Sequence, residues 1–216
     1  KLATDVDPND AYIHQHKAMM ALREKKTEDA LDYIGVASKL HSQDFTIRDT
    51  HARILTARGL EQPWITARTA FAEAENILNA NISRRPTDPY GYLSLAELNQ
   101  ALAQKSDNAE ERASYLSKAY EIVLRGIERC RIKTMLWQLQ GQLELAVGTL
   151  EGARDAFRKA LVERPSNVIT RLLFAKLEEN EGQVPVALDL LRDGLSLSGN
   201  DQRLRHRLGV MLWKYQ

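Results

Sequence analysis

The histidines and the cysteine are the side chains of this sequence with the most versatile chemistry, because they bind metals and take part in catalysis. The chain has five histidines and one cysteine, and only His14 and His16 lie close together among the histidines. Two positions apart on a helix, their imidazoles point in nearly opposite directions and cannot hold one metal ion together. We expect His51 to pack near the contact between two paired helices and His16 to face a groove. The sequence therefore predicts no metal site.

The motifs of the common enzyme classes are absent. The sequence contains no G-x-x-x-x-G-K-[ST] phosphate loop, no G-x-S-x-G nucleophile turn and no H-E-x-x-H zinc motif. Cys130 stands between Arg129 and Arg131, whose charges could activate its thiol. We favour the alternative, a small and partly buried apolar residue. We expect no catalytic residue, no enzymatic activity and no cofactor.

Charge and composition restrict the partners and the compartment. The 216 residues include 30 basic and 29 acidic side chains, which give a formal charge of +1. This balance argues against non-specific nucleic-acid binding, which needs a broad basic surface. No apolar run approaches the roughly 20 residues of a membrane helix, and a single cysteine requires no oxidising compartment. We expect a soluble, cytoplasmic chain, cut from a longer protein because it begins at Lys1 and ends directly after an apolar stretch.

Helices account for almost every segment. Apolar residues recur three and four positions apart, and no stretch shows the sustained alternation of a strand. Turn residues divide the chain at ten places, from which we expect about eleven helices joined by short connections. Two of them are expected to be long, Trp64 to Ile82 and Asn108 to Glu128. The sequence predicts an all-α fold of antiparallel neighbours.

Small residues recur with a fixed period. Gly141, Ala175 and Gly209 are separated by intervals of 34 residues, and Ala18 and Ala52 are separated by the same interval. Where two helices cross closely, a side chain larger than alanine would push their axes apart. The period therefore predicts repeated helix pairs, with insertions of about ten residues in the middle units.

Residues Thr134 to Asn167 resemble a tetratricopeptide repeat (TPR). The residues that carry the resemblance are Trp137, Gly141, Gly148, Ala153, Phe157, Ala160 and Pro165. The following unit matches more loosely, with Arg171 where the family has a large aromatic residue. The resemblance implies a right-handed α-solenoid of antiparallel helix pairs. It implies one TPR-like domain over residues 10–216, with longer helices at about 60–130, after an N-terminal extension over residues 1–9.

The family binds its partners on the first helix of each unit, which lines a concave groove. The resemblance thus implies a non-catalytic scaffold that binds a partner protein or peptide there. Some members hold C-terminal carboxylates through Lys and Asn at set positions; Gln138, Gln142 and Leu172 stand there in this chain, so that mode is not expected. The candidate groove residues are Gln15, His16, Asp49, Arg53, Glu97, Gln138, Gln142, Lys176, Asn180, Arg203, His206 and Arg207.

Other functions remain open from the sequence. Residues 11–18 and 47–52 look similar to repeats behind nucleotide-switch or effector domains of bacterial defence proteins, so the chain could be a sensor or regulatory module of a larger signalling or antiviral protein. Trp213 and Met211 leave open self-association through the C-terminal helix. Arginine clusters near Arg129 and Arg205 could contact RNA, but we do not expect a nucleic-acid partner. The expected partner is a protein or peptide, with no membrane.

Overall fold

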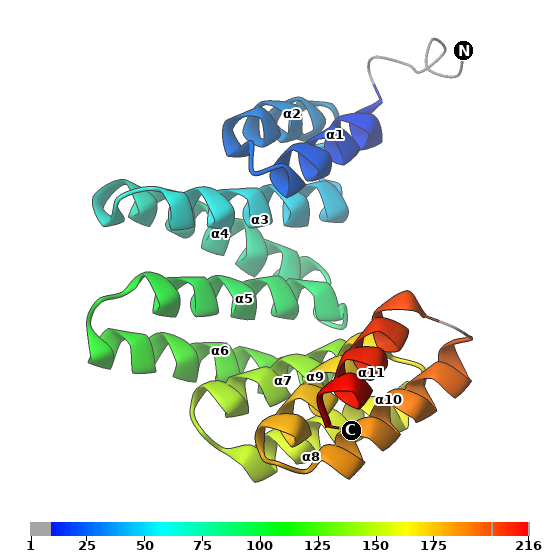
Figure 1. Ribbon diagram of the computed structural model, residues 1–216. Coiled ribbons are helices and arrows are strands. Elements are labelled where there is room, and N and C mark those ends of the chain that lie inside the picture. The colour runs from blue at the N-terminus through cyan, green and yellow to red at the C-terminus, as the bar shows by residue number, and fades with distance from the viewer. Residues whose placement is uncertain (1–9, 200, 216) are drawn as a thin grey trace, which may run out of the picture. The chain divides into compact units, whose positions relative to one another are not determined.

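The computed structural model describes residues 10–199 and 201–215, which contain α-helices and no strand (Figure 1). The predicted N-terminal extension, residues 1–9, lies outside this part. The helices are α1 (Ala11–Arg23), α2 (Thr27–Leu40), α3 (Phe45–Glu61), α4 (Trp64–Arg84), α5 (Pro89–Lys105), α6 (Ala109–Arg129), α7 (Thr134–Ala146), α8 (Leu150–Glu163), α9 (Val168–Asn180), α10 (Val184–Ser198) and α11 (Gln202–Tyr215).

The chain divides into two compact units, Lys1–Cys130 (unit 1) and Arg131–Gln216 (unit 2). Unit 1 holds the pairs α1–α2, α3–α4 and α5–α6, and unit 2 holds α7–α8, α9–α10 and the single helix α11. The number of helices and the two long helices α4 and α6 agree with the sequence prediction. Whether residues 10–216 form one domain remains a prediction. No helix in the described part of the chain is long and apolar enough to cross a membrane.

Short polar side chains start several helices by accepting their free N–H groups. The carboxylate of Asp44 accepts from the backbone N of Thr46 at 2.9 Å and from that of Ile47 at 3.0 Å, and Asp10 accepts from the N of Tyr12 at 2.8 Å. These bonds satisfy donors that have no partner within the helix. The break between α6 and α7 contains no glycine or proline at residues 130–133, so turn residues alone do not mark it.

Glycine allows the closest helix crossing in both units. A Cβ added to Gly141 in α7 would lie 2.5 Å from the ring of Phe157 in α8, and one added to Gly59 in α3 would lie 2.6 Å from the ring of Phe71 in α4. Real Cβ atoms do not approach a ring so closely, so any larger residue must displace the phenylalanine. Each phenylalanine ring therefore requires a glycine at the position that it contacts.

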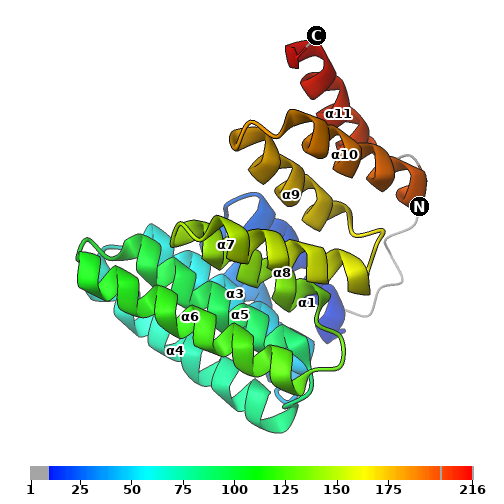
Figure 2. The same ribbon diagram turned by 90° about the horizontal axis from the view of Figure 1, so that it is seen from below.

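Unit 2 ends in a helix that is buried on one side. Helices α9 and α11 both pack against α10 (Figure 2). Leu204 and Met211 of α11 are fully buried in this contact, whereas Trp213 is 86% exposed. The sequence prediction of self-association through both Trp213 and Met211 is therefore wrong for Met211, because this side chain belongs to the core of its own unit. Trp213 remains accessible to a partner.

Candidate functional site

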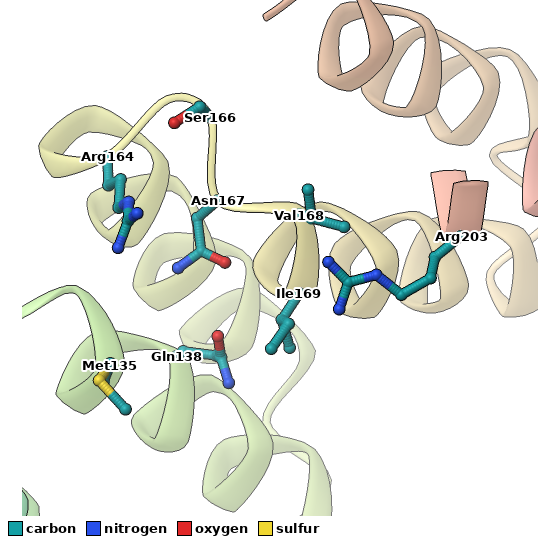
Figure 3. Close-up of a pocket in the computed structure, with 8 residues that line it drawn as sticks. All are labelled: Met135, Gln138, Arg164, Ser166, Asn167, Val168, Ile169 and Arg203. Carbon is teal, nitrogen blue, oxygen red and sulfur yellow. The ribbon is translucent and has the colours of Figure 1, made fainter. Parts of the chain in front are cut away.

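A pocket of about 340 Å³ lies in unit 2, where three segments far apart in the sequence meet. The start of α7 forms one side, the turn before α9 and the first residues of α9 form another, and α11 contributes one long side chain (Figure 3). The lining residues are Met135, Gln138, Arg164, Ser166, Asn167, Val168, Ile169 and Arg203. The pocket thus lies on the first helices of two successive pairs, α7 and α9, on the turn before α9, and on the single helix α11.

A buried threonine fixes two amide side chains of the pocket. Asn167 caps α9, and its Oδ1 accepts from the backbone N of Thr170 at 3.1 Å. The hydroxyl of Thr170 donates to Oε1 of Gln138 at 3.2 Å. Because Thr170 is fully buried, its two donors engage both amide oxygens from inside the protein. The amide nitrogens of Gln138 and Asn167 remain as donors on the pocket side (Figure 3).

Two arginines give the pocket its charge. The guanidinium of Arg203 extends from α11 toward Ile169 (Figure 3). Asp201 holds it, with 2.9 Å from Nη2 to Oδ2 and 3.2 Å from Nε to Oδ1. Hydrogen bonds from Arg203 lower the pKa of Asp201 to about 2, so this carboxylate is ionised at neutral pH. Arg164 makes no ion pair with a described residue. The side chains of Arg164, Arg203 and Asp201 together carry one net positive charge.

Apolar side chains complete the wall. Met135 and Ile169 are 42% and 49% exposed, and Val168 is half-buried. Donor groups next to exposed apolar side chains suit a ligand with both acceptor groups and apolar surface. The lining has no carboxylate, imidazole or thiol to act as base or nucleophile. Within residues 10–199 and 201–215, no group of three His, Cys, Asp or Glu side chains is arranged to hold a metal ion.

No family model matches the sequence, and no curated protein matches it. Solved structures do match. TTC0263, a thermophilic TPR protein of Thermus thermophilus, is 20% identical, with a TM-score of 0.74 over 94% of this chain and 100% of its own. The fold of the present chain is therefore that of a TPR protein. The all-α, TPR-like fold class predicted from the sequence is confirmed.

Two further structural neighbours are more distant in sequence. The human IFIT1 dimer with PPP-AAAA is 14% identical, with a TM-score of 0.69 over 96% of this chain and 47% of its own, so the present chain spans about half of IFIT1. MamA residues 41 to the end, from Desulfovibrio magneticus RS-1, is 13% identical, with a TM-score of 0.53 over 91% of this chain and 98% of its own. At these identities the similarity concerns the fold.

Only some of the groove residues predicted from the TPR resemblance meet at the pocket. Gln138 and Arg203 line it. The other predicted residues of unit 2 lie on the same first helices but outside the lining; Gln142 is half-buried, and Lys176, Asn180 and His206 are exposed or partly exposed.

Arg207, also predicted as a groove residue, has a partner inside the unit. Its guanidinium forms an ion pair with Glu179 of α9. Lys214 and the hydroxyl of Tyr215 reach the other oxygen of Glu179, at 3.1 and 3.2 Å. Burial acts to raise the pKa of Glu179, but these donors outweigh it and lower the pKa. Arg207 therefore ties α11 to α9, which leaves it less available to an acidic ligand than the sequence suggested.

In unit 1, three predicted residues come together between α3 and α5. Asp49 and Arg53 lie on α3 and Glu97 lies on α5. Loss of surrounding water raises the pKa of both Asp49 and Glu97, and the positive charge of Arg53 opposes this. The negative charge of Asp49 adds to the rise in the pKa of Glu97, and that of Asp88 adds to the rise in the pKa of Asp49. A hydrogen bond with Ser94 of α5 also acts to lower the pKa of Asp49. The cluster combines two carboxylates with one exposed guanidinium.

The remaining two candidates of unit 1 lie on α1. The amide nitrogen of Gln15 donates to the backbone oxygen of Thr46 at 3.0 Å and to the hydroxyl of Thr50 at 2.8 Å. Gln15 therefore joins α1 to α3 and is occupied inside the protein. His16 is exposed, and its place in a partner-binding groove stays a prediction.

Sequence reasoning did not place the turn residues Arg164, Ser166 and Asn167 among the candidate binding residues. The TPR resemblance directs attention to first helices, whereas these residues follow a second helix. The signal that could have found them is Pro165, because the turn it marks leads directly into the N-terminus of α9.

Proposed function

We propose that the chain is a non-catalytic protein-interaction scaffold that binds a segment of a partner protein on the first helices of unit 2. The observation that carries this proposal is the pocket at which α7, α9 and α11 meet, because it combines hydrogen-bond donors with exposed apolar side chains. A partner segment that crosses the three helices would place one side chain in the pocket. Gln142, Lys176, Asn180 and His206 would contact its flanking residues.

The pocket is organised before a partner arrives. Thr170 orients the amides of Gln138 and Asn167, and Asp201 holds Arg203. Side chains that are already fixed lose little conformational entropy on binding, so more of the interaction energy appears as affinity. Rigid preformed surfaces of this kind are common in protein complexes.

The carboxylate cluster of unit 1 extends the proposal to a second contact. Asp49 and Glu97 face Arg53, so a partner's lysine or arginine would meet two carboxylates, and the resulting ion pairs would be stronger than fully exposed ones. Self-association through the exposed Trp213 is a separate proposal, and sedimentation of the chain with and without Trp213→Ala tests it.

The alternative function is that of a sensor or regulatory module within a larger bacterial signalling or antiviral defence protein. The pocket would then serve a neighbouring domain of the same polypeptide as well as, or instead of, a separate partner. The surrounding reading frame tests this alternative. An adjoining nucleotide-switch or effector domain that binds unit 2 supports it, and the lack of such a domain removes it.

Site-directed photocrosslinking tests the scaffold function. A benzophenone amino acid is placed at Ile169, at the pocket, and at Val162 of α8, which is 82% exposed and lies outside the pocket lining. We expect partner peptides to be crosslinked from position 169 and not from position 162. Mass spectrometry of the crosslinked peptides identifies the bound segment.

A titration with that segment then measures the contribution of the pocket. Ile169→Glu places a charge against the apolar part of the site and should weaken binding about tenfold or more. Val162→Glu is the matched control, because it also replaces an exposed β-branched residue, and it should leave the affinity unchanged. Equal effects of the two substitutions would exclude the pocket from the interface.

A further inference from the structure

We infer that the pocket of unit 2 recognises a carboxylate side chain, an aspartate or glutamate of the partner segment. This inference rests on the proposed function and specifies the chemistry of its main contact. The pocket offers hydrogen-bond donors on several sides, the amide oxygens of Gln138 and Asn167 are already engaged by Thr170, and the pocket carries one net positive charge.

The two amides are the first part of this argument. An asparagine or glutamine normally presents a donor and an acceptor, and so does not distinguish a carboxylate from an amide. Here the two donors of Thr170, its N–H and its hydroxyl, occupy Oδ1 of Asn167 and Oε1 of Gln138. Rotation of either amide would bring its NH₂ group against a buried donor, which is unfavourable. Both side chains are therefore held as donors.

The backbone adds donors from the same side. Val168 and Ile169 are the first two residues of α9, and both line the pocket. Their N–H groups have no acceptor within the helix, because the bonding pattern needs a carbonyl four residues earlier in the helix. Asn167 uses its side-chain oxygen on Thr170 rather than on either of them. A ligand oxygen at this point would also lie at the positive end of the α9 dipole.

The arginines select a singly charged acid. Arg203 is already paired with Asp201, so the excess charge of the pocket is that of one guanidinium, provided by Arg164. A carboxylate balances this charge, whereas a phosphate group carries close to two negative charges at neutral pH. A triphosphate or a nucleic-acid backbone would require more cations than the lining holds. The observations thus favour an acidic peptide over RNA.

Asp201 competes with the ligand for Arg203, which permits a test in the direction of tighter binding. The carboxylate of Asp201 also caps α11, accepting from the backbone N of Arg203 at 2.9 Å. Asparagine caps a helix about as well as aspartate. Asp201→Asn therefore removes the competing charge while it keeps the helix start, and it should release Arg203 for the ligand.

The test is a nuclear magnetic resonance titration of the whole chain with two small probes, N-acetyl-glutamate N-methylamide and its glutamine counterpart. The side-chain NH₂ signals of Gln138 and Asn167 and the backbone N–H signals of Val168 and Ile169 report the pocket. We expect saturable shifts of these signals with the glutamate probe and none with the glutamine probe. The two probes differ only in acid against amide, so equal responses, or no saturable response to the glutamate probe, would overturn the inference.

Substitutions in the pocket measure how much each charged residue contributes to binding of the glutamate probe. Arg203→Gln and Arg164→Gln should each weaken glutamate-probe binding about fivefold, as expected for partly exposed charge contacts. Asp201→Asn should strengthen it by a similar factor. The control Arg192→Gln alters an arginine of α10 that pairs with Asp189 away from the pocket, and it should have no effect. Thermal unfolding of each variant verifies that the unit remains folded, and Arg203→Lys, which keeps the charge, should retain part of the binding.

Two outcomes separate this inference from the proposed function. Tighter saturation of the same signals by inorganic triphosphate would overturn the carboxylate assignment in favour of a phosphate ligand. A weaker affinity or no change with Asp201→Asn would also overturn it. If Ile169→Glu still weakens binding of the partner segment about tenfold or more in either case, the scaffold function stands and only the recognition of an acid is wrong.

Discussion

Units 1 and 2 build the same helix crossing with different accessory contacts. Both place glycine against phenylalanine, Gly59 with Phe71 and Gly141 with Phe157. In unit 1 the hydroxyl of Tyr92 donates to the backbone oxygen of a proline, Pro86, at 3.0 Å. The comparison shows that the crossing is fixed by size, whereas the contacts around it tolerate different chemistry.

Unit 2 makes the corresponding contact with an arginine. Arg171, six residues after Pro165 as Tyr92 is six residues after Pro86, donates from Nε to the oxygen of Pro165 at 2.9 Å and from Nη1 to the oxygen of Leu190 at 3.0 Å. It is 6% exposed, and burial lowers its pKa. One buried guanidinium thus replaces the aromatic ring that the repeat pattern leads one to expect.

The pockets of the two units also differ in position. In unit 2 the pocket lies on first helices and a turn, as described above. In unit 1 two pockets, of about 180 and 200 Å³, lie along α4, α5 and α6 and share Glu75, Asn99 and Lys118. Their lining mixes both signs of charge with aromatic residues such as Trp64. These pockets of unit 1 thus lie along its two long second helices, and the repeat period alone does not locate them.

The largest expected effect comes from filling the helix crossings. Gly141→Ala should destabilise unit 2, and Gly59→Ala should destabilise unit 1, each by about 2 kcal/mol, because the added carbon overlaps the phenylalanine ring. Chemical denaturation of the 5-fluorotryptophan-labelled chain measures this, since the ¹⁹F signal of Trp64 reports unit 1 and those of Trp137 and Trp213 report unit 2.

A matched control distinguishes overlap from a general effect of glycine. A Cβ on Gly35, inside α2, meets no atom within 4 Å. Gly35→Ala should therefore stabilise the chain by about 0.5 to 1 kcal/mol, because alanine restricts the unfolded chain and favours helix. Loss of stability at Gly35 as large as that at Gly141 would contradict the explanation by size. Reducing the ring with Phe157→Leu should restore part of the stability lost in Gly141→Ala.

The second prediction compares the losses of stability on replacing Arg171 and Tyr92. Arg171→Met leaves the carbonyl of Pro165 without this donor and removes the additional bond to the helical carbonyl of Leu190, so it should cost about 1.5 kcal/mol. Tyr92→Phe removes one hydroxyl bond and should cost about 1 kcal/mol. The same ¹⁹F unfolding curves give both values. A smaller loss for Arg171→Met than for Tyr92→Phe would show that the cost of burying the guanidinium exceeds the value of its two bonds.

Much of this fold could be predicted from sequence, because the period of small residues and the turn residues specify helix pairs locally. The pocket could not be predicted in the same way. Its donors depend on which oxygen Thr170 engages, and its charge depends on the pairing of Arg203 with Asp201. Arg207 illustrates the same difficulty. A stripe of first-helix residues says which side chains share a face, but not that Glu179 of α9 binds this one.

The smallest effect concerns pH and should distinguish the units. His51 of unit 1 is half-buried, and burial lowers its pKa, an effect that the charge of Arg48 increases and that of Glu73 opposes. As the pH falls below about 6.5, the unfolded chain takes up a proton at this position before the folded chain does. The free energy of unfolding of unit 1 should therefore decrease until the pH reaches the lowered pKa.

His51→Gln removes this titration, so its unfolding midpoint, followed at Trp64, should change less over the same pH range. Asp49 and Glu97 act in the opposite direction. Because their pKa values are raised in the folded state, protonation in more acidic solution favours the folded form, and the decrease in stability should lessen or reverse there. If His51→Gln leaves the pH dependence of unit 1 unchanged, the imidazole is not the group that distinguishes this unit, and the loss must come from carboxylates whose ion pairs are broken by acid.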